Sequence, residues 1–124
     1  MNQYLCIAAG GATGALFRFA AANWVHAVLG RDFPWGTLAV NVSGSLAMGF
    51  LYVLLFERTD ADALWRAGLL IGFLGAFTTF SSFSIETLTL IEAGGHLRAA
   101  ANILFSVALC LGGCWLGMVI GRNI

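Results

Sequence analysis

The chain has 124 residues, of which 60% are hydrophobic and 10% are charged, and its formal net charge is zero. A soluble domain carries about 25% charged residues, so this composition excludes an ordinary water-exposed fold. All six basic residues are arginines spread along the chain, which excludes a basic nucleic-acid-binding surface.

Four long apolar segments account for almost the whole sequence. A helix that crosses a bilayer core needs about 20 apolar residues. The sequence therefore predicts an all-α integral membrane protein, one domain over residues 1–124, with four transmembrane helices over about 4–28, 35–56, 64–93 and 97–120. The first segment reads as a retained helix, because no basic region or small-residue cleavage site accompanies it.

Turn and cap residues separate the four segments. Gly30 to Pro34 form a turn signal, and Pro34 suits the first turn of the second helix because a proline there gives up no helical hydrogen bond. In the polar loop after the second segment, Asp60 or Asp62 is expected to cap the third helix.

Arginine counts give the chain almost no preferred orientation. With both termini on one side, that side holds Arg58, Arg66 and Arg122, and the opposite side holds Arg31 and Arg98. Because loop arginines normally set orientation, a near balance predicts insertion both ways. We therefore expect an antiparallel homodimer of oppositely inserted copies.

Glycines recur at four-residue spacing, which brings helix backbones close together in lipid. The pairs and triplet are Gly10/Gly14, Gly68/Gly72 and Gly113/Gly117/Gly121. Spacing alone leaves open whether these contacts lie within one subunit or between two.

Polar residues inside the segments fall into stripes at helical spacing. They are Thr37, Asn41 and Ser45 on the second helix, Ser81, Ser84 and Thr87 on the third, and Asn102 and Ser106 on the fourth. Aligned hydroxyl and amide groups can replace the water around a migrating ion. The alternative is that they bond across helices or to their own backbone.

The segment from Gly75 to Ser84 combines a glycine, two threonines and three serines in mid-span, and these residues weaken a helix. We predict that the third helix is broken between Gly75 and Thr79. Non-helical backbone at this depth is tolerated only where protein or a cavity surrounds it. The freed carbonyl groups would suit a hard cation.

Two aromatic and two charged residues complete the candidate site. Phe80 and Phe83 are three apart, so their rings share a face, and their positive edges could line a path for a small anion. Arg18 lies deep in the first segment and could raise the local anion concentration, or be paired structurally. Glu86 could pair with a cation, cap a neighbouring group or carry a proton.

Three motifs resemble the Fluc/CrcB family of fluoride channels. They are GATGALFRF over residues 11–19, GTLAVNVSGS over 36–45 and GFLGAFTTFSSFSIE over 72–86. Together they are highly specific, and they cover three of the four helices. The fourth helix is less diagnostic.

The resemblance implies a dual-topology homodimer with two antiparallel fluoride pores and a structural sodium ion at its centre. It places the sodium on the backbone carbonyls of Gly75 and Thr78. It places the pore at Phe80, Phe83, Asn41, Thr37, Ser81, Ser84 and Ser106, with Glu86 and Arg18 as motif residues.

The function implied is passive export of cytoplasmic fluoride, and hence fluoride resistance, across a bacterial inner membrane, with no enzymatic activity. A proton-coupled small four-helix exporter is the alternative. It needs a membrane carboxylate, normally in the first helix, and here the candidate is Glu86. A non-conducting assembly protein is a third class, which would show no flux.

Overall fold

The computed structural model describes residues 2–124, which form helices joined by short loops and, over that range, contain no strand. Four stretches are long and apolar enough to cross a membrane: Asn2–Leu29, Trp35–Arg58, Ala63–Glu92 and His96–Arg122. Each end lies within two residues of the predicted span. The chain is a multi-pass membrane protein.

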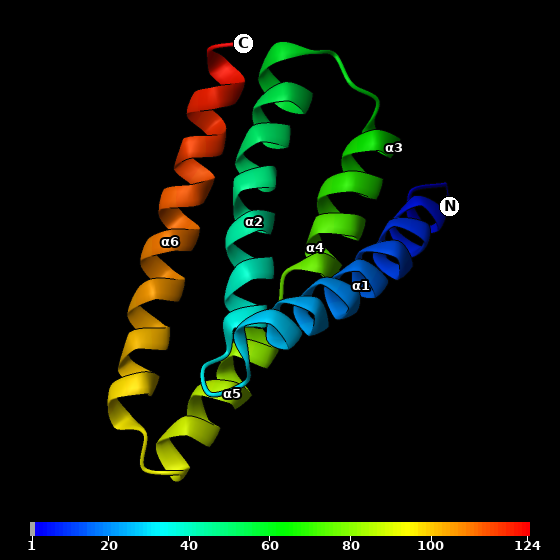
Figure 1. The fold of residues 1–124 in the computed structure, drawn as a ribbon. Helices are drawn as coiled ribbons and strands as arrows, with labels where there is room; N and C mark the ends of the chain where they lie inside the picture. Colours follow the sequence, from blue (N-terminus) through cyan, green and yellow to red (C-terminus); the bar gives the residue numbers. More distant parts are fainter. Residues whose placement is uncertain (1) are drawn as a thin grey trace.

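The first and last spans are single helices, whereas the middle two are built from shorter pieces. In chain order the elements are α1 (Asn2–Leu29), α2 (Trp35–Tyr52), the π-helix η1 (Val53–Arg58), α3 (Ala63–Arg66), the π-helix η2 (Ala67–Leu74), α4 (Gly75–Phe77), α5 (Phe80–Glu92) and α6 (His96–Arg122). Figure 1 shows α2 and α6 running side by side, with α1 crossing obliquely and packing against η2.

The helix ends follow the local sequence signals. Gly30 and Gly94 end α1 and α5 with φ of 88° and 84°, a backbone conformation that favours glycine. Pro34 directly precedes α2. The Asp62 carboxylate accepts the Leu64 N–H at 3.1 Å, which confirms a predicted cap of the third span.

Glycines let the helix backbones touch within one chain. A Cβ atom at Gly49 of α2 would overlap the Cys114 carbonyl oxygen of α6, and one at Gly117 would overlap the Leu46 carbonyl oxygen. Gly14 of α1 faces the Phe73 carbonyl of η2 in the same way. These small residues therefore serve packing inside the subunit.

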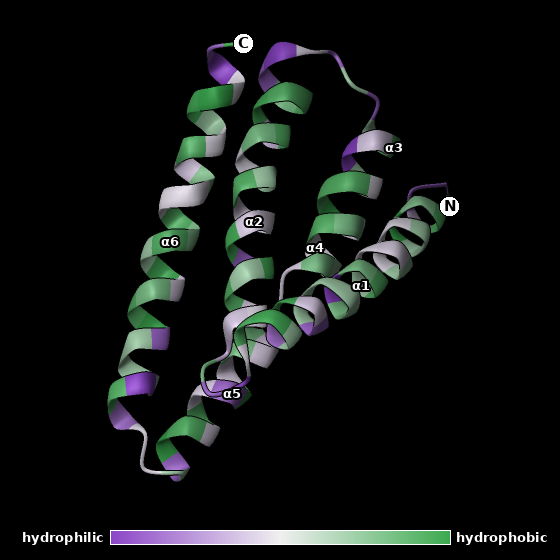
Figure 2. Ribbon diagram, in the orientation of Figure 1, coloured by the Kyte–Doolittle hydropathy of each residue, from purple (hydrophilic) through white to green (hydrophobic). Residues whose placement is uncertain are grey.

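Hydrophilic residues gather at the helix ends and in the loops, and the lengths between them are largely hydrophobic (Figure 2). Large apolar side chains stay exposed on the outer faces, such as Leu16 on α1 and Leu104 on α6. Such faces need an apolar surrounding, which a bilayer supplies.

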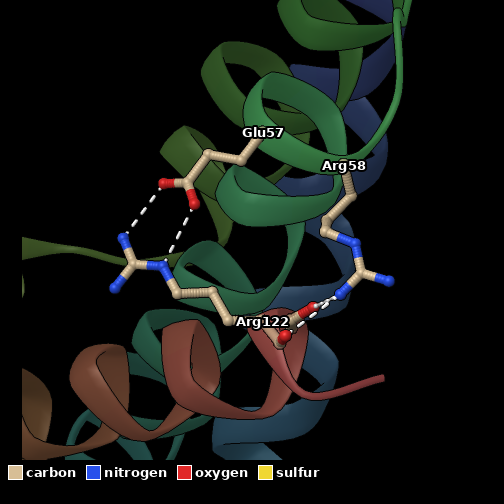
Figure 3. Close-up of polar contacts among 4 residues, drawn as sticks. Glu57, Arg58 and Arg122 are labelled. Atoms are coloured by element: carbon tan, nitrogen blue, oxygen red, sulfur yellow. Dashed lines mark hydrogen bonds and ion pairs between the residues drawn. The ribbon is translucent and has the colours of Figure 1, made fainter.

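An ionic clasp joins the end of the second span to the end of α6 (Figure 3). Arg122 donates to both carboxylate oxygens of Glu57, at 3.1 and 3.0 Å. Arg58 donates to the carbonyl oxygens of Gly121, Arg122 and Ile124. The clasp therefore pairs carbonyls that a helix end leaves unbonded.

The close approach of α2 and α6 predicts the effect of one added methyl group. Gly49→Ala should destabilise the protein by about 1–3 kcal/mol, because the methyl group must displace backbone atoms. Gly112→Ala is the matched control, since no atom of another helix lies within 4 Å of its Cβ position. Thermal unfolding in detergent measures both, and equal stability of the two variants would contradict the assigned contact.

Candidate functional site

The third span leaves helical geometry at two consecutive residues, Thr78 (φ −90°, ψ 156°) and Thr79 (φ −150°, ψ 117°). Asn41 of α2 holds this extended segment. Its Nδ2 donates to the Thr79 carbonyl at 3.0 Å, and its Oδ1 accepts the Thr79 N–H at 2.7 Å. One side chain thus pairs both backbone groups of Thr79.

The two threonine hydroxyls stabilise the helix ends on either side. Thr78 donates through Oγ1 to the Leu74 carbonyl at 2.9 Å, which ends the preceding helix. Thr79 Oγ1 accepts the Ser82 N–H at 3.1 Å and caps α5. Threonine side chains compete with the helical pattern in this way, which explains why the interruption lies here.

The backbone carbonyls of Gly75 and Thr78 are among those that lose their helical donors at the interruption. In a continuous α-helix the Thr79 N–H would bond the Gly75 carbonyl, and the Ser82 N–H would bond the Thr78 carbonyl. Here those donors go to Asn41 Oδ1 and Thr79 Oγ1 instead. The Gly75 and Thr78 oxygens are therefore left without the helical bonds that would otherwise occupy them.

A cavity of about 330 Å³ lies beside the extended segment, between α2, α5 and α6. We call it the aromatic cavity. It brings together four predicted pore residues, Asn41, Phe80, Phe83 and Ser106. The rest of its lining is Ser45, Thr78, Thr79, Val107, Cys110 and Leu111.

The two phenyl rings of this cavity form a tilted pair. Their centroids are 5.3 Å apart and their planes meet at 42°. Phe80 is 78% exposed in the single chain, whereas Phe83 is half-buried. Positive ring edges, amide hydrogens and hydroxyl groups without a fixed charge make the lining suited to a small anion.

A second cavity of about 200 Å³ holds the charged residues, and we call it the charged cavity. Arg18, Thr37 and Glu86 line it together with His26 and Arg31. Thr79 lines both cavities, so the extended segment lies between them.

The charged groups of this cavity differ in how far they are paired. Arg18 Nε donates to the Ala76 carbonyl at 3.0 Å, next to the extended segment. Glu86 Oε1 is buried and has no hydrogen-bond partner among residues 2–124. A buried carboxylate oxygen without a partner is costly, so this atom is suited to a proton or to a passing ligand.

Three predicted pore residues lie away from the aromatic cavity in the single chain. Thr37 is buried beside the charged cavity. Ser81 is exposed, with its hydroxyl 3.3 Å from that of Thr79. Ser84 donates to its own helix at the Phe80 carbonyl, 2.9 Å away. Their part in conduction remains a prediction.

Sequence reasoning missed two contacts at the site. His26 Nε2 accepts the Gly36 N–H at 3.0 Å and ties α1 to the first turn of α2, with no sequence signal beyond its position near a span end. Asn102 connects Ser106 to Thr87 through buried hydrogen bonds. The four-residue spacing of Asn102 and Ser106 was the available signal.

Side-chain metal ligands do not gather anywhere in the described part of the chain. No group of three or more His, Cys, Asp or Glu residues within residues 2–124 could hold a metal ion. A cation site near the interruption would therefore have to use backbone oxygens, such as those of Gly75 and Thr78.

The sequence matches a family model and several curated proteins. The family model, described as CrcB-like protein, Camphor Resistance (CrcB), matches residues 5–118. The fluoride-specific ion channel FluC of Methylococcus capsulatus is 56% identical over 125 residues, which cover 100% of this chain and 55% of that protein.

Other relatives match over their full length. Proteins of the same name from Coxiella burnetii and Geobacter sulfurreducens are 52% and 48% identical, and the matches cover 100% of both chains in each comparison. The chain thus spans about half the length of the Methylococcus relative but the whole of these two. From the family match and these identities, the chain belongs to the CrcB family.

Proposed function

We propose that this chain forms a fluoride-specific ion channel that lets fluoride leave the cytoplasm passively, and that it is not an enzyme. The observation that carries the proposal is the aromatic cavity, where Phe80, Phe83, Asn41 and Ser106 converge beside the extended segment. Relatives at up to 56% identity bear the name fluoride-specific ion channel.

The lining supports this chemistry because fluoride holds its water tightly. A pore must offer hydrogen-bond donors as that water leaves, and it must bind weakly enough for the ion to exit. Asn41 uses one amide hydrogen on Thr79, so the second remains for an ion. Ring edges and the Ser106 hydroxyl add neutral contacts.

The active form in this proposal is an antiparallel homodimer with dual topology and two pores. The balance of loop arginines supports insertion in both directions. Phe80, which is 78% exposed, would gain cover from a second copy. The bacterial inner membrane is the proposed location, because the named relatives come from bacteria.

A structural sodium ion at the dimer centre belongs to the same proposal. The Gly75 and Thr78 carbonyl oxygens fit it, since both have lost their helical donors and hard cations prefer oxygen ligands. When bound, the ion would supply buried positive charge that favours a nearby anion.

A proton-coupled exporter is the second candidate, favoured by one observation. Glu86 Oε1 is buried without a partner among residues 2–124, as a coupling carboxylate could be. Glu86 lines the charged cavity together with Arg18 and Thr37, which would place a proton site next to the ion path.

Flux from liposomes separates these candidates. We expect fluoride efflux from reconstituted protein to be the same with and without a proton gradient, and to persist in Glu86→Gln. Efflux that stops when the gradient is collapsed would support the exporter. No efflux from verified proteoliposomes would favour a non-conducting assembly protein.

The phenyl rings should matter for rate but not for assembly. Phe80→Ile and Phe83→Ile should each slow fluoride efflux by at least about tenfold, because an aliphatic side chain has no positive edge to turn toward the anion. Leu111→Ile, in the same cavity, is the control. Wild-type efflux in both phenylalanine variants would contradict a role of the phenyl rings in fluoride conduction.

Asn41 should affect both stability and flux. Asn41→Ala removes two hydrogen bonds to Thr79 and should cost about 1–3 kcal/mol of stability, at roughly 0.5–1.5 kcal/mol each. Efflux should fall as well, because the extended segment loses its support. Ser43→Ala is the control, since Ser43 bonds only to its own helix. An Asn41→Ala variant with wild-type stability but slow efflux would instead mean that the amide acts on the ion and does not support the fold.

A further inference from the structure

Three buried polar side chains form a continuous hydrogen-bonded chain from α6 to α5. Ser106 Oγ donates to Asn102 Oδ1 at 3.4 Å, Asn102 Nδ2 donates to Thr87 Oγ1 at 2.9 Å, and Thr87 Oγ1 donates to the Phe83 carbonyl at 2.7 Å. Asn102 is only 2% exposed. Both ends of the chain, Ser106 and Phe83, line the aromatic cavity.

Every bond in this chain points the same way, from Ser106 toward the Phe83 carbonyl. The Ser106 proton is therefore used on Asn102, and the hydroxyl turns only lone pairs to the cavity. That arrangement is wrong for an anion, which needs a donor. The Ser106 bond is also the longest of the three, beyond the usual range for O–H···O contacts. It is therefore the weakest of the three bonds and the easiest to break.

A half-turn of the Asn102 amide can reverse the chain within the same volume, because its oxygen and nitrogen exchange places and are nearly the same size. After a half-turn, Nδ2 donates to Ser106 Oγ, and Oδ1 accepts the Thr87 hydroxyl. Ser106 then donates into the cavity. Three hydrogen bonds exist before and after, since the bond to an anion replaces the bond to the Phe83 carbonyl.

We propose that Asn102 is a positioning residue for the ion path, whose amide rotation turns the Ser106 hydroxyl from acceptor to donor when an anion enters the aromatic cavity. The inference rests on the proposed fluoride channel. In the reversed state Asn102 also polarises the Ser106 hydroxyl by donating to it, which strengthens the bond to the anion.

Matched variants test the chain by fluoride efflux from liposomes. Asn102→Leu keeps the size but removes both amide groups, and Ser106→Ala removes the final donor. Each should slow efflux by about tenfold, the size expected for the loss of one hydrogen bond. The double variant should be no slower than the slower single one, because the two residues act as a unit.

Two substitutions at Thr87 test its hydroxyl group with little change to the contact between the helices. Thr87→Ser retains the hydroxyl and should keep wild-type efflux, whereas Thr87→Val removes it and should slow efflux. This comparison decides the matter if Asn102→Leu fails to assemble. Equal efflux in the two variants would overturn the chain as a functional unit.

A spectroscopic measurement addresses the amide directly. In bilayers, the side-chain nitrogen signal of ¹⁵N-labelled Asn102 should shift when fluoride replaces chloride, and the shift should vanish in Ser106→Ala. A structural hydrogen bond would show no such response. Wild-type protein without efflux would overturn the channel and this inference with it. This inference alone would be overturned if wild-type efflux were normal, the effects of Asn102→Leu and Ser106→Ala added up in the double variant, and the Asn102 signal did not respond to fluoride.

Discussion

A backbone that leaves helical geometry at membrane depth must find new partners for its amide and carbonyl groups, because lipid offers none. Asn41 supplies both partners for Thr79 through a single amide. The position of the extended segment is thus fixed from α2, a different helix. Phe80 follows Thr79 directly, so the direction of its ring depends on this contact.

The close packing of the helices decides which polar groups can meet at that point. Gly49 and Gly117 bring the backbones of α2 and α6 into contact. Asn41 on α2 and Ser106 on α6 then lie on two walls of one cavity. Larger residues at the glycines would separate these walls. Small residues outside the cavity therefore contribute to the site by setting the distance across it.

Local chemistry predicted much of this architecture. Apolar run lengths gave the four spans to within two residues, and Asp62 marked the start of the third. The threonine and serine content pointed to the Gly75 to Thr79 region, where Thr78 and Thr79 are extended. Such features depend on residues close together in sequence, so spacing and propensity suffice to find them.

Contacts between distant residues were harder to predict. The polar stripe on the second helix predicted which face of the helix Asn41 occupies. It did not predict that the Asn41 amide would hold the Thr79 backbone, 38 positions away. Ser81 and Ser84 share a helical spacing with Thr87, yet only Thr87 is buried. The rotation of α5 about its axis relative to α6 decides which of these side chains is buried. That rotation follows from packing along the whole helix pair.

The division between the two cavities gives the site a physical order under the proposed function. Arg18, Arg31 and Glu86 line the charged cavity, whereas the aromatic cavity has only neutral groups, and Thr79 borders both. Full charges attract ions strongly but also hold them, so they suit a region where ions gather. Neutral donors bind more weakly, so an ion that has lost its water there can still leave. Because Asn41 fixes the backbone of Thr79, which lines both cavities, its amide helps to set where one kind of lining gives way to the other.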